Sequence, residues 1–477
     1  MNRLLPFFAA AVVAGCAALY TDTRFHDDLS RQIRGDQWQA AIDVVAKAKE
    51  KGAYPDKDRL LYLLDMGALH HYAGEYEQSN RYLEEAERTS EELFTASISR
   101  AVLSMMLNDN VLEYRGEDYE EIYINVFKAL NYIALGQHDE ALVEIRRIDI
   151  KLQLLTDKYG KLVDALNGAP DPHIRFSAPS VDFHNDALGR YLGALLYYYD
   201  GKHDDARIEI ENYYRAIAAQ PQIYSQPALE LSLSVLDTTL LHVMAFTGTG
   251  PEKVAIDFRV HTGKNHLLVF PAHRGERFAE RFAWEGISEG YYFKFSLPEL
   301  QRVNNRVVAI EVHADDRYLG TLRPIEDLSR VAEVTFQRRK SLIYLKAIVR
   351  TTLKGIAGQK AKEKFSKDDE QENKDQQKNQ TDKEKKREKK SGRSGLAEWF
   401  FSAAVDAVTE ISEQADLRRW HAMPAVAHAG YFPLPEGTYN IRLDFLDAHR
   451  QIIFQKFFPR VQVQRSRLNM VEAALLQ

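Results

Sequence analysis

Few residues of the 477-residue chain have the type and spacing that chemistry requires, and the first is its only cysteine, Cys16. A single cysteine can form neither an internal disulfide nor a Cys-based metal cluster. His70 and His71 come closest to a metal-binding pair, but neighbouring residues on a helix point about 100° apart and make poor joint ligands. We therefore expect these two histidines to pack between helices.

Acidic pairs occur at four places, each in a turn-like or highly charged stretch. They are Asp27–Asp28, Asp204–Asp205, Asp315–Asp316 and Asp368–Asp369. Such positions favour capping or solvation over catalysis. The sequence has no Gly-rich phosphate loop, no Gly-x-Ser-x-Gly elbow and no His-Glu-x-x-His zinc motif. We predict no catalytic residue, no cofactor and no metal site, and expect that the protein is not an enzyme.

The segment from Ala415 to Trp420 reads Ala-Asp-Leu-Arg-Arg-Trp and concentrates charged and aromatic side chains. Two interpretations stay open. Trp420, flanked by arginine and histidine, could bind a ligand. Alternatively, Asp416 pairs with an arginine while Trp420 fills a seam between domains, and we favour this second role because a buried tryptophan adds a large apolar area.

The residues around Cys16 give it a specific chemistry. A short charged region ends at Arg3, and Leu4 to Val13 is apolar. About ten apolar residues are too few for a membrane span, which takes roughly 20. The sequence Val13-Ala14-Gly15-Cys16 resembles the lipobox of bacterial lipoproteins, in which the cysteine thiol carries a diacylglycerol and the freed amine is acylated.

This motif predicts a lipoprotein signal peptide over residues 1–15, lipid attachment at Cys16 and a tether over 16–29. Two or more acyl chains hold a protein stably on a bilayer. The residue after Cys16 is Ala17 rather than aspartate, which favours the outer membrane by the sorting rule of enteric bacteria. An ordinary signal peptide with an incidental cysteine is the alternative.

Residues 30–246 have the pattern of a helical domain, with little proline and with apolar residues every three to four positions. Short segments within it resemble one another. Each has a turn glycine, an aromatic ring or histidine two residues later, and a small residue at the fifth position. The glycines are Gly74, Gly136 and Gly201, the small residues are Ser79, Ala141 and Ala206, and a partial copy covers Gly35 to Ala41.

These segments resemble the tetratricopeptide repeat, in which paired helices pack through small residues. Glycine permits the left-handed conformation that ends the first helix. Seven residues before each turn, Gly67, Ala129 and Ala194 are the expected small partners on that helix. The turn glycines at 35, 74, 136 and 201 lie farther apart than the 34-residue period of the family, so further helices or loops must intervene. Generic helical hairpins are the alternative.

A last helix of this domain is predicted from about Ser225 to Phe246, and Thr247 to Pro251 marks a boundary. Beyond it, apolar and polar residues alternate as in strands. Strands are expected over 254–260, 267–270, 291–297, 307–312, 439–445 and 452–463. We expect the parts 252–329 and 421–477 to join in one β-sandwich-like domain, with two separate small sheets as the alternative. The predicted fold class is thus α+β and multidomain.

A helical insertion separates the two strand-rich parts. Helices are predicted over 330–358 and 396–420, on either side of a linker over 359–395. Lys360 to Arg393 holds 13 Lys or Arg and 9 Asp or Glu among 34 residues. Such a segment cannot bury enough apolar area to offset its chain entropy, so we expect disorder. A contact of its basic part with anionic lipid or glycan is the alternative.

The layout resembles a family of uncharacterised bacterial envelope lipoproteins that contain tetratricopeptide-like repeats. The resemblance rests on the lipobox at Cys16, the repeat turns, Ile348-Val349-Arg350 with Lys354, and the segment Ala415 to Trp420 with Pro424. Family members tend to read Ala-Asp-Thr-Arg-Ser-Trp-x-x-Leu-Pro in that segment, whereas this chain has Leu417, Arg419 and Met423.

The resemblance implies a non-enzymatic role in the envelope and names no substrate. A formal net charge of −6 does not fit a nucleic-acid binder. The leading hypothesis is a lipid-anchored scaffold on the periplasmic face of the outer membrane, which docks protein partners of envelope, cell-wall or export machinery through its repeats. The alternative is a periplasmic ligand- or glycan-binding lipoprotein that uses the β domain around Trp420.

Overall fold

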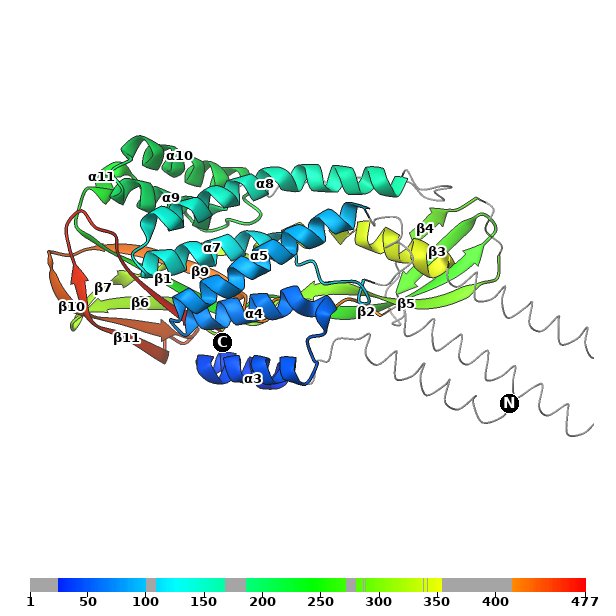
Figure 1. Ribbon diagram of the computed structural model, residues 1–477, viewed down its shortest axis with the longest axis horizontal. Helices are drawn as coiled ribbons and strands as arrows, with labels where there is room; N and C mark the ends of the chain where they lie inside the picture. Colours follow the sequence, from blue (N-terminus) through cyan, green and yellow to red (C-terminus); the bar gives the residue numbers. More distant parts are fainter. Residues whose placement is uncertain are drawn as a thin grey trace, which may run out of the picture.

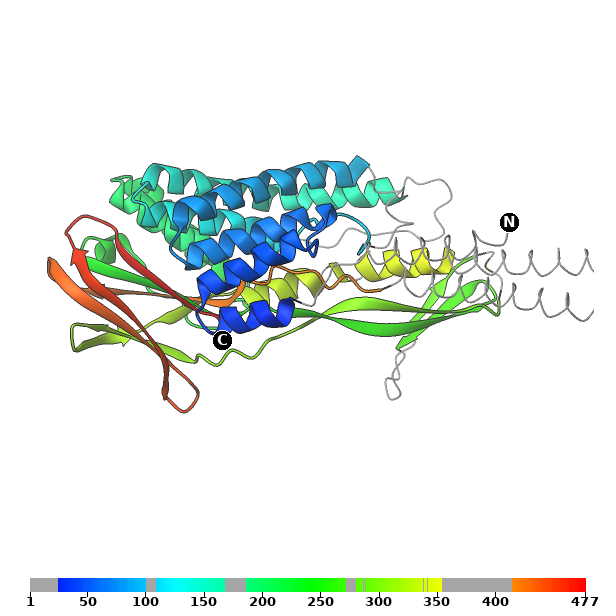
Figure 2. The same ribbon diagram turned by 60° about the horizontal axis from the view of Figure 1, so that its bottom comes forward.

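The computed structural model describes residues 25–99, 109–167, 186–271, 280–353 and 414–477, apart from positions 286, 288, 338 and 341. Helices form one layer over the sheets, and a further sheet extends from one end of the molecule (Figure 1, Figure 2). The fold is therefore of the mixed α+β class, as the sequence predicts.

The helical layer is built from consecutive helix pairs, each joined by a three-residue turn. The pairs are α2 (His26–Arg34) with α3 (Trp38–Glu50), α4 (Arg59–Tyr72) with α5 (Tyr76–Ser99), α7 (Asp118–Ala134) with α8 (His138–Asn167), and α9 (Ala187–Tyr199) with α10 (His203–Ala219). A short 3-10 helix, η1 (Asp56–Asp58), precedes α4. Turns this short fold each helix back against its predecessor.

The four turns share one hydrogen-bond pattern. In each, the last turn residue donates its N–H to the carbonyl five residues earlier, at 2.8–3.0 Å; the donors are Gln37, Glu75, Gln137 and Lys202. The left-handed residue is glycine in the last three turns, as predicted, but in the first it is Asp36, with φ 55°. The left-handed turn residue of the first copy is therefore Asp36 rather than Gly35, while Ala41 keeps its place five residues later. Aspartate is among the few residues other than glycine that tolerate this conformation.

The strands of the described residues form three four-stranded sheets. Sheet 1 has the order β12 (Asn469–Leu475), β1 (Leu240–Thr249), β9 (Pro424–Pro433), β8 (Arg323–Asp327). Sheet 2 has the order β11 (Ile452–Val463), β10 (Gly437–Leu446), β6 (Ala309–Ala314), β7 (Arg317–Thr321). Sheet 3 has the order β4 (Glu280–Ala283), β3 (His266–Pro271), β2 (Glu252–Gly263), β5 (Tyr292–Gln301).

Sheet 1 lies between the helices and sheet 2, and is covered on both faces. Side chains of β1 alternate between the two sides. Leu240, Met244 and Phe246 belong to the core shared with the helices, whereas Leu241, Val243 and Ala245 belong to the core shared with sheet 2. Sheets 1 and 2 therefore each contain strands from both strand-rich parts of the chain, 252–329 and 421–477. Sheet 3 contains strands from the first part alone.

The predicted helix from Ser225 to Phe246 is wrong. The structure has a single helical turn, α11 (Leu233–Leu236), and then β1. All ten residues of β1 are buried. A strand that is buried on both faces loses the alternation of polar and apolar residues, and its sequence then cannot be told from a buried helix.

Sheet 3 packs against a helix that occupies residues 328–337 and 342–353, where the sequence predicts one. Its core includes Val163 from α8, Trp284, and Ile348 of that helix. The chain leaves sheet 1 after β8 and returns to it in β9, which pairs with β8. The insertion thus begins and ends on neighbouring strands.

Two predictions fall outside the described residues: the signal peptide with Cys16 and the linker over 359–395. The tether over 16–29 is too long, because α2 begins at His26. The helix predicted over 396–420 is described only from residue 414, and residues 414–420 are irregular rather than helical.

Candidate functional site

The small residues of the helix pairs lie in close contacts, where the repeat pattern predicts them. Ser79, Ala141 and Ala206 are fully buried. The Ser79 hydroxyl donates to the carbonyl of Gly67 on the paired helix, at 2.7 Å. A Cβ added to Gly67 would lie 2.5 Å from Cδ2 of Leu83, so a larger residue here would require the buried Leu83 side chain to shift.

Sheet 1 covers the inner helices α4, α7 and α9, and the outer helices α5, α8 and α10 lie on the opposite side (Figure 2). Along α7, every residue from Asp118 to Asn131 except Glu121 is buried. In a free-standing repeat array, inner helices line a groove that is open to a partner. Here the chain's own strands occupy that face, so a partner of the folded protein must bind elsewhere.

Residues 415–423, which we name the clasp, run between the helical layer and the start of β2. Arg418 is its most connected residue. Nε and Nη2 donate to the carboxylate of Asp416, and Nη1 donates to Asp58 at 2.7 Å. The carbonyls of Leu112 and Asp109 accept from Nη1 and Nη2. All five guanidinium N–H groups thus have an acceptor, and the expected pairing of Asp416 with an arginine is present.

Trp420 belongs to the seam between the clasp and the helices. It is among the largest fully buried side chains, and its ring centroid lies 5.6 Å from that of Phe127. Its backbone N–H donates to Glu120 at 2.9 Å, and the next residue, His421, donates its backbone N–H to Asp65. In this position the indole presents no ring face on which a ligand could stack.

Two glutamates at the start of α7 differ in protonation. Burial raises the pKa of Glu120 to about 7, and the nearby charge of Glu117 adds to the shift. Burial acts in the same direction on Glu117, but the charges of Arg339 and Lys253 hold the pKa of Glu117 below its usual value. Glu120 is therefore the clasp contact that titrates near neutral pH.

The two adjacent histidines have packing roles, as expected. Nδ1 of His70 contacts Glu75. His71 links three elements: Nδ1 faces the side-chain amide oxygen Oδ1 of Asn131 on α7 at 2.7 Å, and Nε2 faces Glu472 on β12 at 2.6 Å. Burial opposes a charged ring, but Glu472 raises the pKa of His71. Among the described residues, no group of three or more His, Cys, Asp or Glu side chains could hold a metal ion.

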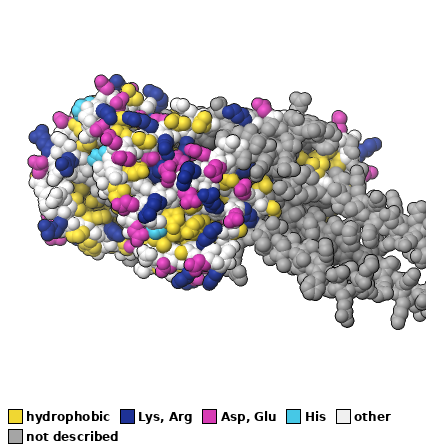
Figure 3. All heavy atoms as spheres, in the orientation of Figure 1, with side chains coloured by type: hydrophobic (Ala, Val, Ile, Leu, Met, Phe, Trp, Pro, Cys, Tyr) yellow, Lys and Arg dark blue, Asp and Glu magenta, His cyan; other side chains and the backbone are white. Residues whose placement is uncertain are grey.

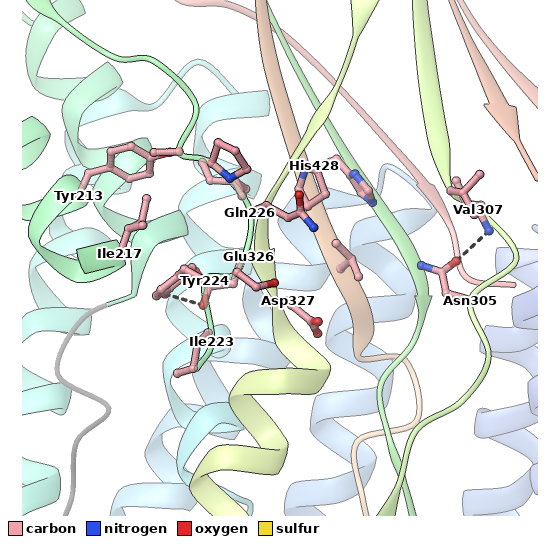
Figure 4. A pocket seen from close by; sticks show the side chains of 17 residues that line it. Tyr213, Ile217, Ile223, Tyr224, Gln226, Asn305, Val307, Glu326, Asp327 and His428 are labelled. Carbon is pink, nitrogen blue, oxygen red and sulfur yellow. Dashed lines mark hydrogen bonds between the residues drawn. The ribbon is translucent and has the colours of Figure 1, made fainter. Parts of the chain in front are cut away.

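A cavity of about 230 Å³ lies between the connection from α10 to α11 and strands β8 and β9 (Figure 4). Glu326 is the buried carboxyl group in its wall. The Tyr224 hydroxyl donates to Oε1 at 2.9 Å, and the backbone N–H of Leu188 donates to Oε2 at 3.0 Å. Both acceptor atoms of Glu326 are therefore engaged by the protein.

Glu326 and Asp186 form a pair at the N-terminus of α9. Burial and then the charge of Asp186 hold the pKa of Glu326 well above its ordinary value, and burial raises the pKa of Asp186. Two adjoining carboxyl groups cannot both ionise, so they share a proton. On the opposite wall, burial lowers the pKa of His428 to about 4, and this ring contacts Thr247 at 3.0 Å. Glu326 thus holds β8 against the start of α9, whereas His428 joins β9 to β1.

The outer helix α8 exposes an apolar stripe that sequence reasoning missed. Val143, Ile150 and Leu154 are 45%, 56% and 55% exposed. Their spacing of seven and four residues places them on one helix face. We name these three residues the α8 stripe. The sequence signal that could have revealed it is that α8 has more aliphatic residues than one buried helix face can hold.

Charged residues surround the apolar groups on the helical layer. Figure 3 shows Lys and Arg interspersed with Asp and Glu over the face in view, with smaller groups of hydrophobic side chains between them. On α8 itself, Arg147 pairs with the buried Glu87 of α5 at 2.7 Å. The stripe therefore lies on a helix that is joined to α5 by ion pairs with the buried Glu87.

These features define a mixed α+β protein whose helix pairs are locked onto their own sheet. No family model, curated protein or solved structure matches this chain. In the part of the chain that the structure describes, no helix is long and apolar enough to cross a membrane.

Proposed function

We propose that this protein is a lipid-anchored scaffold of the bacterial envelope, and that it docks a protein partner on the α8 stripe. The observation that carries the proposal is the exposure of three aliphatic side chains on one face of a rigid helix. Exposed apolar side chains mark interaction sites when they form a contiguous patch. Each Å² of apolar surface that a partner covers contributes roughly 25 cal/mol.

The anchor is the lipidated Cys16, on the periplasmic face of the outer membrane. Support comes from the lipobox-like sequence and from the absence of any other cysteine in the chain. In this proposal the helix pairs are tetratricopeptide-like repeats, supported by their common turns and buried small residues. Sheets 1 and 2 act as a sandwich-like support, because they share one hydrophobic core.

Because sheet 1 covers the inner helices, the docking surface of this scaffold differs from that of a free-standing repeat array. A partner segment cannot enter a groove that β1 and β9 fill, so docking uses the outer row of helices. On that row, α10 adds the exposed side chains of Ile208 and Tyr214. The partner is therefore expected to be an envelope protein that presents a complementary apolar surface to the outer helices.

The test is capture of partners from detergent-solubilised envelopes with the full-length, lipidated protein. Changing Ile150→Glu and Leu154→Glu together puts charge on the stripe without touching a buried residue. We expect the double variant to lose a partner that the parent captures reproducibly. The control Ile452→Glu, at an exposed position on β11, should retain it. Equal capture by the double variant, or no reproducible partner, contradicts the proposal.

A further inference from the structure

The outer face of sheet 2, turned away from sheet 1, carries one line of side chains across all four strands. The register aligns Phe457 of β11, Arg442 of β10, His313 of β6 and Tyr318 of β7. Neighbouring strands lie about 4.8 Å apart, so the two aromatic residues stand roughly 14 Å apart. A polar strip thus lies between two rings on an open face.

Both rings are more than half exposed to solvent. Phe457 is 61% exposed and Tyr318 is 53% exposed. The Tyr318 ring also packs edge-on against the His313 ring, with centroids 5.5 Å apart, which fixes its orientation. Uncovered aromatic faces forgo the free energy of apolar burial, and a ligand that covers them recovers it.

The charges in this line and in the adjoining row of the same face, which holds Gln455, Asp444 and Glu311, neutralise one another. Arg442 contacts Asp444 at 3.0 Å, and Arg450 contacts Glu311 at 2.6 Å. His313 lies 3.2 Å from the same Asp444 carboxylate. Asp444 is itself buried beneath these groups and also accepts from Gln455 at 2.7 Å. The strip therefore presents fixed donors and acceptors without an excess of either charge, which suits a neutral, hydroxyl-rich ligand better than an ion.

We infer that this face binds a neutral oligosaccharide in an extended conformation. The C–H faces of its sugar rings would cover Tyr318 and Phe457. Its hydroxyl groups would exchange hydrogen bonds with Arg442 between the rings and with Glu311 and Gln455 in the adjoining row. The line of side chains crosses all four strands, which matches a chain of sugar units rather than a single small molecule. This site is separate from the α8 stripe and does not depend on the scaffold role.

The experiment is a titration of the full chain with neutral tetrasaccharides, including chitotetraose, cellotetraose and maltotetraose, at millimolar concentrations by calorimetry. An anionic tetragalacturonate serves as the comparison ligand. We expect at least one neutral tetrasaccharide to bind, more tightly than the anionic one. The double variant Tyr318→Ala with Phe457→Ala should weaken binding by about tenfold or more, since each removes an aromatic contact.

The matched control is Tyr292→Ala, which removes an exposed tyrosine from sheet 3. It should leave the affinity unchanged, and circular dichroism should show that all variants keep the parent fold. Failure of every neutral tetrasaccharide to bind overturns the inference. Binding that survives the double variant, or that is lost equally in Tyr292→Ala, overturns it too, as does binding of a protein partner to this face with no response to sugar.

Discussion

Arg418 and Asp58 lie 360 positions apart in the chain, yet Nη1 and Oδ1 meet at 2.7 Å with both side chains buried. This ion pair fixes the clasp to the start of α4. The clasp in turn contacts β2, because Lys253 donates to the carbonyl of Arg418 at 2.8 Å. The helices and the sheets are therefore joined through a segment that is neither helix nor strand.

Replacing Arg418→Met should destabilise the protein strongly. The change removes the arginine that pairs with the buried carboxylate of Asp58, and breaking a buried ion pair by removing one partner typically costs ~3–5 kcal/mol. The measurement is urea unfolding followed by circular dichroism. The neighbouring Leu417 is exposed, so Leu417→Ala is the control and should stay within ~0.5 kcal/mol of the parent. Equal stabilities of the two variants would mean that the clasp is not structural.

Introducing Glu at Ala141 or Ala206 should destabilise the helical layer. Both alanines are fully buried at contacts between paired helices, where overpacking costs ~1–3 kcal/mol and an unpaired charge adds desolvation. Thermal unfolding of each variant measures the effect. Val143→Glu, two residues from Ala141 but exposed, is the matched control and should be nearly silent. Parent-like stability in Ala141→Glu would show that this helix contact is misassigned.

Glu120 should make stability fall as pH rises towards neutrality. Its pKa is raised from 4.5 to about 7 in the folded protein, so the protonated form is the one that folding favours. The stabilising contribution of Glu120 is fully present below pH 4.5, decreases between pH 4.5 and about 7, and is lost above that pH. A shift of this size corresponds to a loss of the order of 3 kcal/mol.

The free energy of unfolding of Glu120→Gln should depend less on pH over this range. Gln cannot ionise, and its carbonyl can still accept from the Trp420 N–H. Urea unfolding at several pH values between 4 and 8 gives both profiles. Glu92→Gln, an exposed change on α5, should keep the parent's slope. If Glu120→Gln keeps it as well, another group is responsible for the pH dependence.

Cys16→Ser should abolish membrane attachment, because a hydroxyl cannot form the thioether that carries the lipid. We expect an unprocessed or soluble protein when cell fractions are separated and probed by immunoblotting. Ala17→Ser is the control, because it leaves the thiol in place. Full membrane partitioning of a Cys16→Ser protein cleaved before residue 16 would refute lipid attachment at this cysteine.

Local signals allowed much of the fold to be predicted. The turn glycines Gly74, Gly136 and Gly201 adopt positive φ, and alternation located strands such as β2 and β10 because each has one covered face. Prediction failed where burial is two-sided, as in β1, whose ten buried residues carry no period. It also missed β9 and β12, whose partners lie far away in the sequence.

The site residues were harder to predict, because their roles depend on distant contacts. The sequence suggested that Asp416 pairs with an arginine, but it could not supply Asp58 as the second carboxylate. In the sequence, Glu120 is an ordinary acidic residue in the first turn of a helix. Its burial depends on the clasp, which is distant in the sequence. Nothing in the sequence revealed that sheet 1 covers the inner helices, which moves the expected docking surface to α8.

The most direct test of docking on the α8 stripe is photo-cross-linking in intact envelopes. A benzophenone amino acid is placed at Ile150, at Leu154 or, as a control, at the exposed Tyr292 of sheet 3. Docking on α8 predicts a discrete cross-linked species of higher mass from positions 150 and 154, and none of that mass from 292. No adduct at 150 and 154, or the same adduct at all three positions, would contradict it.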